Sequence, residues 1–268
     1  MNINFKFLLL GTSLSLIPHY VAAQCTTTPD CAAMGYKETA NKGGCLKCPT
    51  GNGWYCPEPK EEKAVLGQCT GYAKNCKIGD ILNSDGTCTT NKESGKMPLG
   101  VVIYIGGDNC GYAMTASPIQ KNIMWSSSYT TTGIGATTSW QTAIKNFDAC
   151  ANTQKIIQQG SSSEYPAAWA AVNYAPSAAP ATKGKWCLPA PGMLNSLYTN
   201  LNAINNTISK LGGTQLTNDN EHIWSSSEYN SNYAWVFCTS NGADWGGVDY
   251  INKDSYSNYY VVRPVIAF

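Results

Sequence analysis

The sequence is poor in histidine and in charged side chains. Of its 268 residues two are histidines, His19 and His222, and charged residues make up 13%. A multi-histidine metal site needs more imidazoles, and a hydrolytic triad needs a histidine beside a positioned nucleophile and an acid. Neither Trp-Ser-Ser-Ser stretch, at Trp125 and Trp224, has the glycine-flanked setting of a nucleophile elbow. We therefore predict that the protein is not an enzyme and holds no metal or cofactor.

The sequence also lacks an excess of charge of one sign. It contains 18 Lys and Arg against 17 Asp and Glu, scattered along the chain. A nucleic-acid or anionic-membrane partner normally requires a basic stripe or patch. These partners are therefore not expected.

Long apolar runs are missing after the first residues. Met1–Ala23 contains Lys6, an apolar run from Phe7 to Ile17 and the small-residue ending Val21-Ala22-Ala23. This pattern is typical of a secretory signal peptide, and the run is shorter than the roughly 20 residues that span a bilayer. We predict a signal peptide at 1–23, export to the cell surface or the medium, and no transmembrane segment in the mature chain.

Cysteine, in contrast, is abundant, with 12 residues, all after the predicted cleavage site. An even number in an oxidising compartment favours disulfide bonds. Eight of the 12 lie between Cys25 and Cys88, which predicts a Cys-rich, disulfide-stapled region at 24–95. The pairing stays open. The other four cysteines are widely spaced, as expected for disulfide-forming residues of a larger domain at 96–268: Cys110, Cys150, Cys187 and Cys238.

The larger region begins with a hairpin pattern and continues with helices. Gly100–Ile105 is rich in β-branched residues, the turn residues 106–109 follow, and Cys110–Thr115 can return as the partner strand. Pro166 suits the first position of an Ala-rich helix. Apolar residues then recur at helical spacing between Leu194 and Leu211, as one helix or two, ending at Gly212-Gly213.

From His222 onward the pattern predicts strands and turns. Ala234–Ser240 and Asp244–Tyr250 flank the hairpin turn Asn241-Gly242, and Tyr259–Phe268 is predicted as one final strand. Strands early and late with helices between them indicate the α+β class.

Four short motifs carry a resemblance to a known family. They are Gly184–Pro189 (GKWCLP), Trp224–Glu228 (WSSSE), Ala234-Trp235 and Val262–Val265 (VRPV). In this order they resemble the Legionella collagen-like C-terminal and Fibrobacter major-paralogue domain family. Together with Gly95–Val102 (GKMPLGVV), the resemblance covers about residues 95–268.

The resemblance implies a C-type-lectin-like fold, in which the first and last strands pair and a loop-rich sheet face carries a binding site. Some members of the family are variable proteins of diversity-generating retroelements. Tyr229–Tyr233 and Asp249–Tyr260 are dense in Asn, Tyr, Asp and Ser, as such diversification would produce; polar turns between strands are the alternative. The calcium and sugar motifs of C-type lectins are absent, so calcium-dependent sugar binding is not expected.

The tail also has the composition of a binding surface. Tyr and Trp provide contact area at low entropic cost, and Ser and Asn add adaptable hydrogen bonds. The predicted ligand-binding residues are Tyr229, Asn230, Asn232, Tyr233, Ser240, Trp245, Asp249, Tyr250, Asn252, Tyr256 and Asn258. The residues predicted to be structural are Trp186, Trp224, Glu228, Trp235 and Arg263, with Glu228 as a candidate partner of Arg263.

These observations predict a secreted or surface-displayed recognition or adhesion protein that binds a protein or glycan ligand. Two alternatives remain. Formylglycine-generating oxidases share the broader fold but depend on reactive cysteines and a copper-binding cleft, whereas a structural envelope protein would have no selective ligand.

Overall fold

The computed structural model describes residues 46–47, 54–55, 63–217, 221–238 and 247–268. The predicted signal peptide lies outside them, as do most cysteines of the predicted Cys-rich region.

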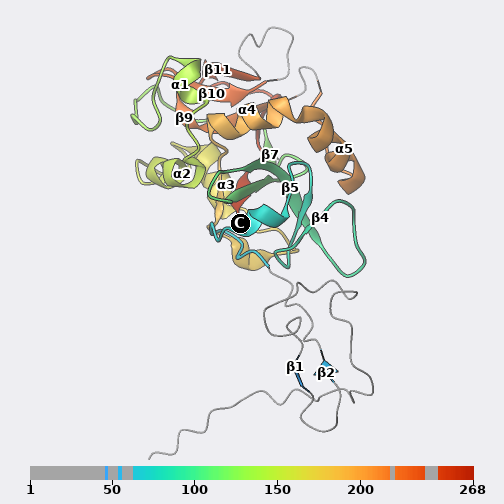
Figure 1. Cartoon of the computed structure of the whole chain (residues 1–268). Helices are drawn as coiled ribbons and strands as arrows, with labels where there is room; N and C mark the ends of the chain where they lie inside the picture. The colour runs from blue at the N-terminus through green and yellow to red at the C-terminus, as the bar shows by residue number, and fades with distance from the viewer. Residues whose placement is uncertain (1–45, 48–53, 56–62, 218–220, 239–246) are drawn as a thin grey trace, which may run out of the picture. The chain divides into compact units, whose positions relative to one another are not determined.

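The chain divides into two compact units, Met1–Glu61 and Glu62–Phe268. In the first unit, β1 (Leu46–Lys47) pairs antiparallel with β2 (Trp54–Tyr55). The second unit contains two sheets and, among the described residues, five α-helices (Figure 1). The predicted α+β class is confirmed.

One sheet has six strands, and every neighbouring pair in it is antiparallel. Two of its strands, β3 and β4, come from the range predicted to be Cys-rich, so the sheet includes residues on both sides of position 95. In spatial order the strands are β4 (Cys88–Thr89), β3 (Ile81–Asn83), β5 (Pro98–Ile105), β6 (Gly111–Met114), β13 (Val265–Ala267) and β8 (Trp186–Cys187).

The predicted hairpin at the start of the larger region is confirmed as β5 and β6. The backbone N–H of Gly106 donates to Cys110 O at 2.9 Å across the turn, and Asn109 there has a φ of 58°. The last strand, β13, pairs with β6, which leaves β5 between β3 and β6.

The other sheet has five strands and contains four of the eleven residues predicted to bind ligand: Tyr233, Asp249, Tyr250 and Asn252. Its edge strand β11 pairs antiparallel with β10, as predicted, and β12 runs parallel to β9. In spatial order the strands are β11 (Val248–Asn252), β10 (Tyr233–Phe237), β9 (His222–Glu228), β12 (Tyr260–Val262) and β7 (Gln120–Lys121).

The prediction of one final strand is wrong, because Arg263-Pro264 divides it. Proline has no N–H to donate to a ladder and its φ is restricted. β12 therefore ends at Val262 in one sheet, and β13 begins at Val265 in the other.

Three helices match the predictions closely. α3 begins at Pro166, and the 194–211 pattern forms two helices that meet at Asn200. Short 3-10 turns occupy Tyr72–Asn75 and Pro180–Thr182. The α-helices are α1 (Trp140–Ala143), α2 (Ala149–Ile157), α3 (Pro166–Asn173), α4 (Pro191–Thr199) and α5 (Leu201–Leu211).

Helices α1 and α2 were not predicted from the sequence. α1 is a single turn, and α2 buries the polar side chains of Asn152 and Thr153, which interrupts an apolar stripe. The Thr153 hydroxyl donates to Ala149 O at 2.8 Å and accepts the N–H of Leu188 at 3.0 Å. The Asn152 side-chain amide donates to Asn146 Oδ1 and Ser227 Oγ, both at 3.3 Å, so both buried polar side chains are hydrogen-bonded and compatible with a helix.

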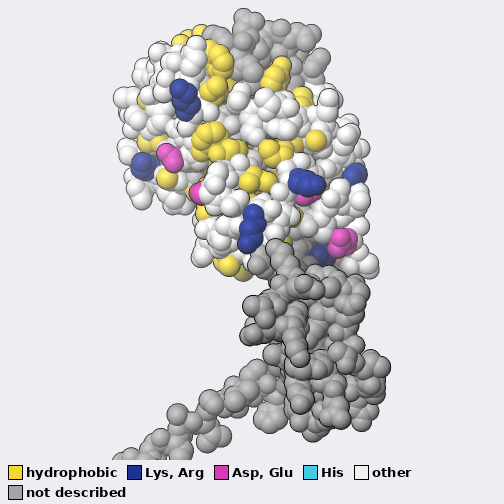
Figure 2. All heavy atoms as spheres, viewed as in Figure 1, with side chains coloured by type: hydrophobic (Ala, Val, Ile, Leu, Met, Phe, Trp, Pro, Cys, Tyr) yellow, Lys and Arg dark blue, Asp and Glu magenta, His cyan; other side chains and the backbone are white. Residues whose placement is uncertain are grey.

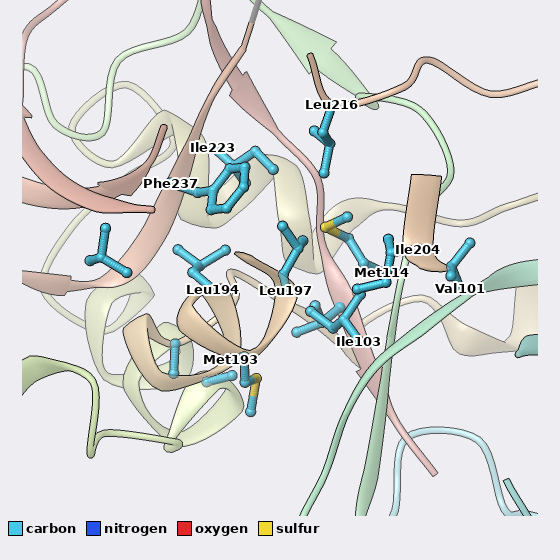
Figure 3. Close-up of a cluster of buried hydrophobic side chains, with 14 of the residues drawn as sticks. Val101, Ile103, Met114, Met193, Leu194, Leu197, Ile204, Leu216, Ile223 and Phe237 are labelled. Atoms are coloured by element: carbon cyan, nitrogen blue, oxygen red, sulfur yellow. The ribbon is translucent and has the colours of Figure 1, made fainter. Parts of the chain in front are cut away.

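α4 packs between the two sheets and joins their cores. Figure 3 shows Leu194 and Leu197 lying near Ile223 and Phe237 of the five-stranded sheet, with Met114 and Ile103 of the six-stranded sheet on the other side. These side chains have no exposed surface. Burial of each of these side chains stabilises the fold by about 1.5–3 kcal/mol, so the cluster fixes the two sheets relative to each other.

Three disulfides join six of the seven described cysteines: Cys69–Cys110, Cys76–Cys88 and Cys150–Cys187. The first links the predicted Cys-rich range to the β5–β6 hairpin, and the last links α2 to β8. Cys238 is buried at the end of β10. Among the described residues, no helix is both long and apolar enough to cross a bilayer.

Candidate functional site

Three tyrosines gather on one face of the five-stranded sheet. Tyr229 directly follows β9, Tyr233 begins β10, and Tyr250 lies in the middle of β11. The rings of Tyr229 and Tyr250 stack with centroids 3.9 Å apart, and Tyr233 stands edge-on to them at 6.2 and 5.4 Å. Fully buried Trp235 contacts Tyr229 and Tyr250 edge-on. The cluster thus has a buried aromatic base and partly exposed tyrosines.

A fourth tyrosine extends this cluster from a distant part of the chain. Tyr129 is 48% exposed, and the exposed Asp254 carboxylate lies close to its hydroxyl. Hydrogen bonding to that carboxylate, together with its negative charge, raises the pKa of Tyr129, and nearby Tyr233 adds to the effect. We call the following set the tyrosine face: Tyr129, Tyr229, Asn232, Tyr233, Tyr250, Asn252 and Asp254.

Two residues adjacent in sequence to members of the tyrosine face form a buried ion pair. Glu228 and Lys253 both have fully buried side chains, and the Lys253 ammonium donates to Glu228 Oε1. The same carboxylate accepts the backbone N–H groups of Thr132, at 2.9 and 3.0 Å, and of Gly133, at 2.8 Å. The Thr131 hydroxyl donates to it as well. Since the carboxylate is satisfied on both oxygens, its burial is chemically tolerable.

Lys253 completes the connection to the same loop. Its ammonium donates to Thr130 O at 3.0 Å and lies 5.0 Å from the centroid of the Trp125 ring. Burial lowers the pKa of Lys253, while the hydrogen bond and charge of Glu228 oppose that shift.

This Glu228–Lys253 clamp joins the three segments that carry the tyrosine face. Glu228 precedes Tyr229, Lys253 lies between Asn252 and Asp254, and the bonded loop begins just after Tyr129. The clamp therefore holds side chains from distant parts of the chain in one arrangement.

Arg263, for which Glu228 was the predicted candidate partner, has a different partner. Its guanidinium donates to Glu221 Oε2 at 2.6 Å, to Ala116 O at 3.0 Å and to Thr214 O. The predicted pairing is wrong because the two acids lie at opposite ends of the β9 region. Glu221 precedes the strand beside the β12–β13 junction, whereas Glu228 ends it.

The predicted ligand-binding residues do not all share one surface. Tyr250 packs on the core cluster that contains Trp235, whereas its neighbour Ile251 packs on the other core cluster. Side chains alternate along a strand, so Asp249 points to the side opposite Tyr250. The Asn230 side chain accepts the N–H groups of Asn232 and Tyr233, which shapes the turn.

The remaining predicted positions lie in loops. Tyr256 is 65% exposed, and Asn258 is exposed, between β11 and β12. Ser240 and Trp245 lie outside the described residues. Tyr129 and Asp254 were missed: Tyr129 lies in a Ser- and Thr-rich stretch far from the tail, and only its exposed aromatic character could have drawn attention to it.

The side chains predicted to be structural are all fully buried. The three indole N–H groups each donate a hydrogen bond: that of Trp186 to Thr182 Oγ1, that of Trp224 to Ile123 O and that of Trp235 to Thr137 O.

A groove of about 780 Å³ lies between residues 115–120 and the ends of α3 and α5, and none of the predicted ligand-binding residues lines it. On the side of the molecule shown in Figure 2, charged side chains are scattered and form no patch of one sign. Within the described ranges, no group of three or more His, Cys, Asp or Glu side chains is arranged to hold a metal ion.

Comparison with known proteins gives a distant structural similarity. No family model matches the sequence, and no curated protein matches it. Among solved structures, the chain is similar to a fimbrial protein from Bacteroides ovatus, with 16% sequence identity and a TM-score of 0.49. The similarity covers 72% of this chain and 49% of that one, so the chain spans about half the length of the fimbrial protein.

Proposed function

We propose that the protein is an exported recognition protein that binds a protein or glycan ligand noncovalently through the tyrosine face, without catalysis. The observation that carries this proposal is the cluster of Tyr229, Tyr233 and Tyr250, partly exposed and positioned by the buried Glu228–Lys253 clamp. Rigid aromatic side chains lose little conformational entropy on binding, and neighbouring asparagines can donate and accept hydrogen bonds. Such a surface suits selective binding.

Export is supported by cysteine chemistry. Disulfides persist in oxidising compartments, and three join six of the seven described cysteines. Together with the signal-peptide pattern at 1–23, this supports secretion or display at the cell surface.

The finer fold assignment is part of the proposal. We propose a C-type-lectin-like domain of the family that the GKWCLP, WSSSE and VRPV motifs resemble. The buried Trp186, Trp224, Glu228 and Arg263 within these motifs support it, because they have structural contacts that a conserved framework would need.

A binding assay with matched variants tests the function. The full-length exported chain is labelled and applied to printed arrays of glycans and of extracellular proteins. We expect selective, saturable binding that Tyr233→Ala weakens about tenfold or more, as for a central aromatic contact. The matched control is Tyr104→Ala. Tyr104 lies in the six-stranded sheet, is partly buried, and stacks on Phe147 with ring centroids 4.5 Å apart. Absence of any selective ligand, or equal loss in both variants, would refute the proposal.

Diversification of the tail is tested separately in DNA. We propose that the segment encoding Tyr229–Tyr260 is a target of a diversity-generating retroelement. A neighbouring reverse transcriptase gene and a near-copy of this segment that differs at template adenines are expected. If the near-copy is missing, this part of the proposal fails and ligand binding remains.

A further inference from the structure

The charges around the tyrosine face restrict the kind of ligand that it can accept. Three segments build its surroundings: 126–139, 229–233 and 247–260. Lys253 is their single Lys or Arg, and it is fully buried against Glu228. Asp254 is exposed beside Tyr129. The surface therefore combines aromatic rings with a carboxylate and has no exposed cation of its own.

The flat face of a tyrosine ring attracts cations through the ring quadrupole, by about 0.5–1 kcal/mol at exposed sites. The exposed Asp254 carboxylate beside the Tyr129 ring adds to this attraction.

We infer that the tyrosine face binds an arginine side chain presented by a protein partner. This rests on the proposed function and names the chemistry of its ligand. The guanidinium group is planar and weakly hydrated, so it can stack on the exposed Tyr129 ring. Lys253 bonded to Thr130 O holds Asp254 near Tyr129, and the exposed Asp254 carboxylate can accept two guanidinium N–H groups.

The clamp explains why the site needs no reorganisation. Lys253 holds the backbone at Asp254, and through Thr130 O it also holds the loop that carries Tyr129. The ring and the carboxylate are therefore positioned before the ligand arrives, which lowers the entropic cost of binding.

The test uses two peptides that differ in one group. The probes are acetyl-Gly-Ser-Arg-Ser-Gly-amide and the same peptide with citrulline, which has nearly the shape of arginine and no charge. Binding to the full chain is followed by NMR of ring-labelled tyrosines. We expect the arginine peptide to bind about fivefold more tightly or better, to shift the signals of Tyr129 and Tyr233, and to weaken as salt is added.

Matched variants locate the effect. Asp254→Asn should reduce the affinity for the arginine peptide about fivefold, whereas Asp148→Asn, which removes an exposed carboxylate at the start of α2, should leave it unchanged. Equal binding of the two peptides, or an equal effect of the two variants, overturns the inference. If an array ligand is lost in Tyr233→Ala but does not depend on Asp254, the proposed function stands and the arginine inference fails.

Discussion

Glu228 and Lys253 are ionisable side chains without exposed surface, and each is satisfied by the other and by the loop at 130–133. Taking two charges out of water is costly, and their attraction offsets that cost only when the surrounding hydrogen bonds are complete. The pair therefore specifies where the loop and the two strands meet, more than it adds stability. Removing one partner leaves the other charge buried.

Glu228→Gln should accordingly destabilise the protein by about 3–5 kcal/mol, because the Lys253 ammonium loses its counter-ion. The free energy of unfolding in urea measures this. Adding Lys253→Met to Glu228→Gln should recover part of the loss. A double variant as unstable as the sum of the two single variants would contradict the role of the pair.

The carboxylate of Glu164 gives a prediction about pH. The backbone N–H and the hydroxyl of Ser161 donate to it, and both hydrogen bonds lower the pKa of Glu164 below its ordinary value of 4.5. Because the folded state favours the ionised form, this contribution is complete above pH 4.5 and is lost as the pH falls through the lowered pKa. The urea concentration at the unfolding midpoint should be higher for the wild type than for Glu164→Gln, and this difference should be larger at pH 7 than at pH 3. An equal difference at the two pH values would contradict this.

At the scale of elements, local signals determined some of the boundaries. Pro166 begins α3, and the glycine pair after Leu211 ends α5, as predicted. Pro264 was present in the predicted final strand, but its effect depended on tertiary structure. One sheet receives the residues before it and the other sheet receives those after it.

Gly212 offers a test of the helix end. It caps α5 with a φ of 73°, and a Cβ there would meet no atom within 4 Å. Gly212→Ala should therefore cost about 1–2 kcal/mol, from the left-handed backbone alone. Gly107→Ala is the control, since that site is equally open and has no positive φ. Thermal unfolding should separate the two variants; equal midpoints would contradict the assignment.

For the whole molecule, the connection between the sheets matters most. α4 buries its apolar side chains against both, and Cys150–Cys187 joins α2, which packs on β9, to β8 in the six-stranded sheet. The helix and the disulfide together fix the position of the tyrosine face relative to the rest of the second unit.

Replacing both cysteines of Cys150–Cys187 with alanine should lower the free energy of unfolding by about 3–4 kcal/mol, the closure entropy of a loop of this length. The sequence separation is 37, against 12 for Cys76–Cys88, whose removal should cost about 1 kcal/mol less. Urea unfolding of the two double variants and the wild type measures both effects. Unchanged stability after loss of Cys150–Cys187 would rule out its proposed stabilising role.

The sequence by itself determined the α+β class, the first hairpin, the start of α3 and the end of α5, because periodicity, proline and glycine act locally. Only the tertiary structure decided that Arg263 pairs with Glu221, that Glu228 pairs with Lys253, and that Tyr129 joins the tail tyrosines. These contacts connect residues far apart in the chain, and a charged or aromatic residue carries no local signal of its partner. Its partner is set by which strands and loops the tertiary fold brings side by side.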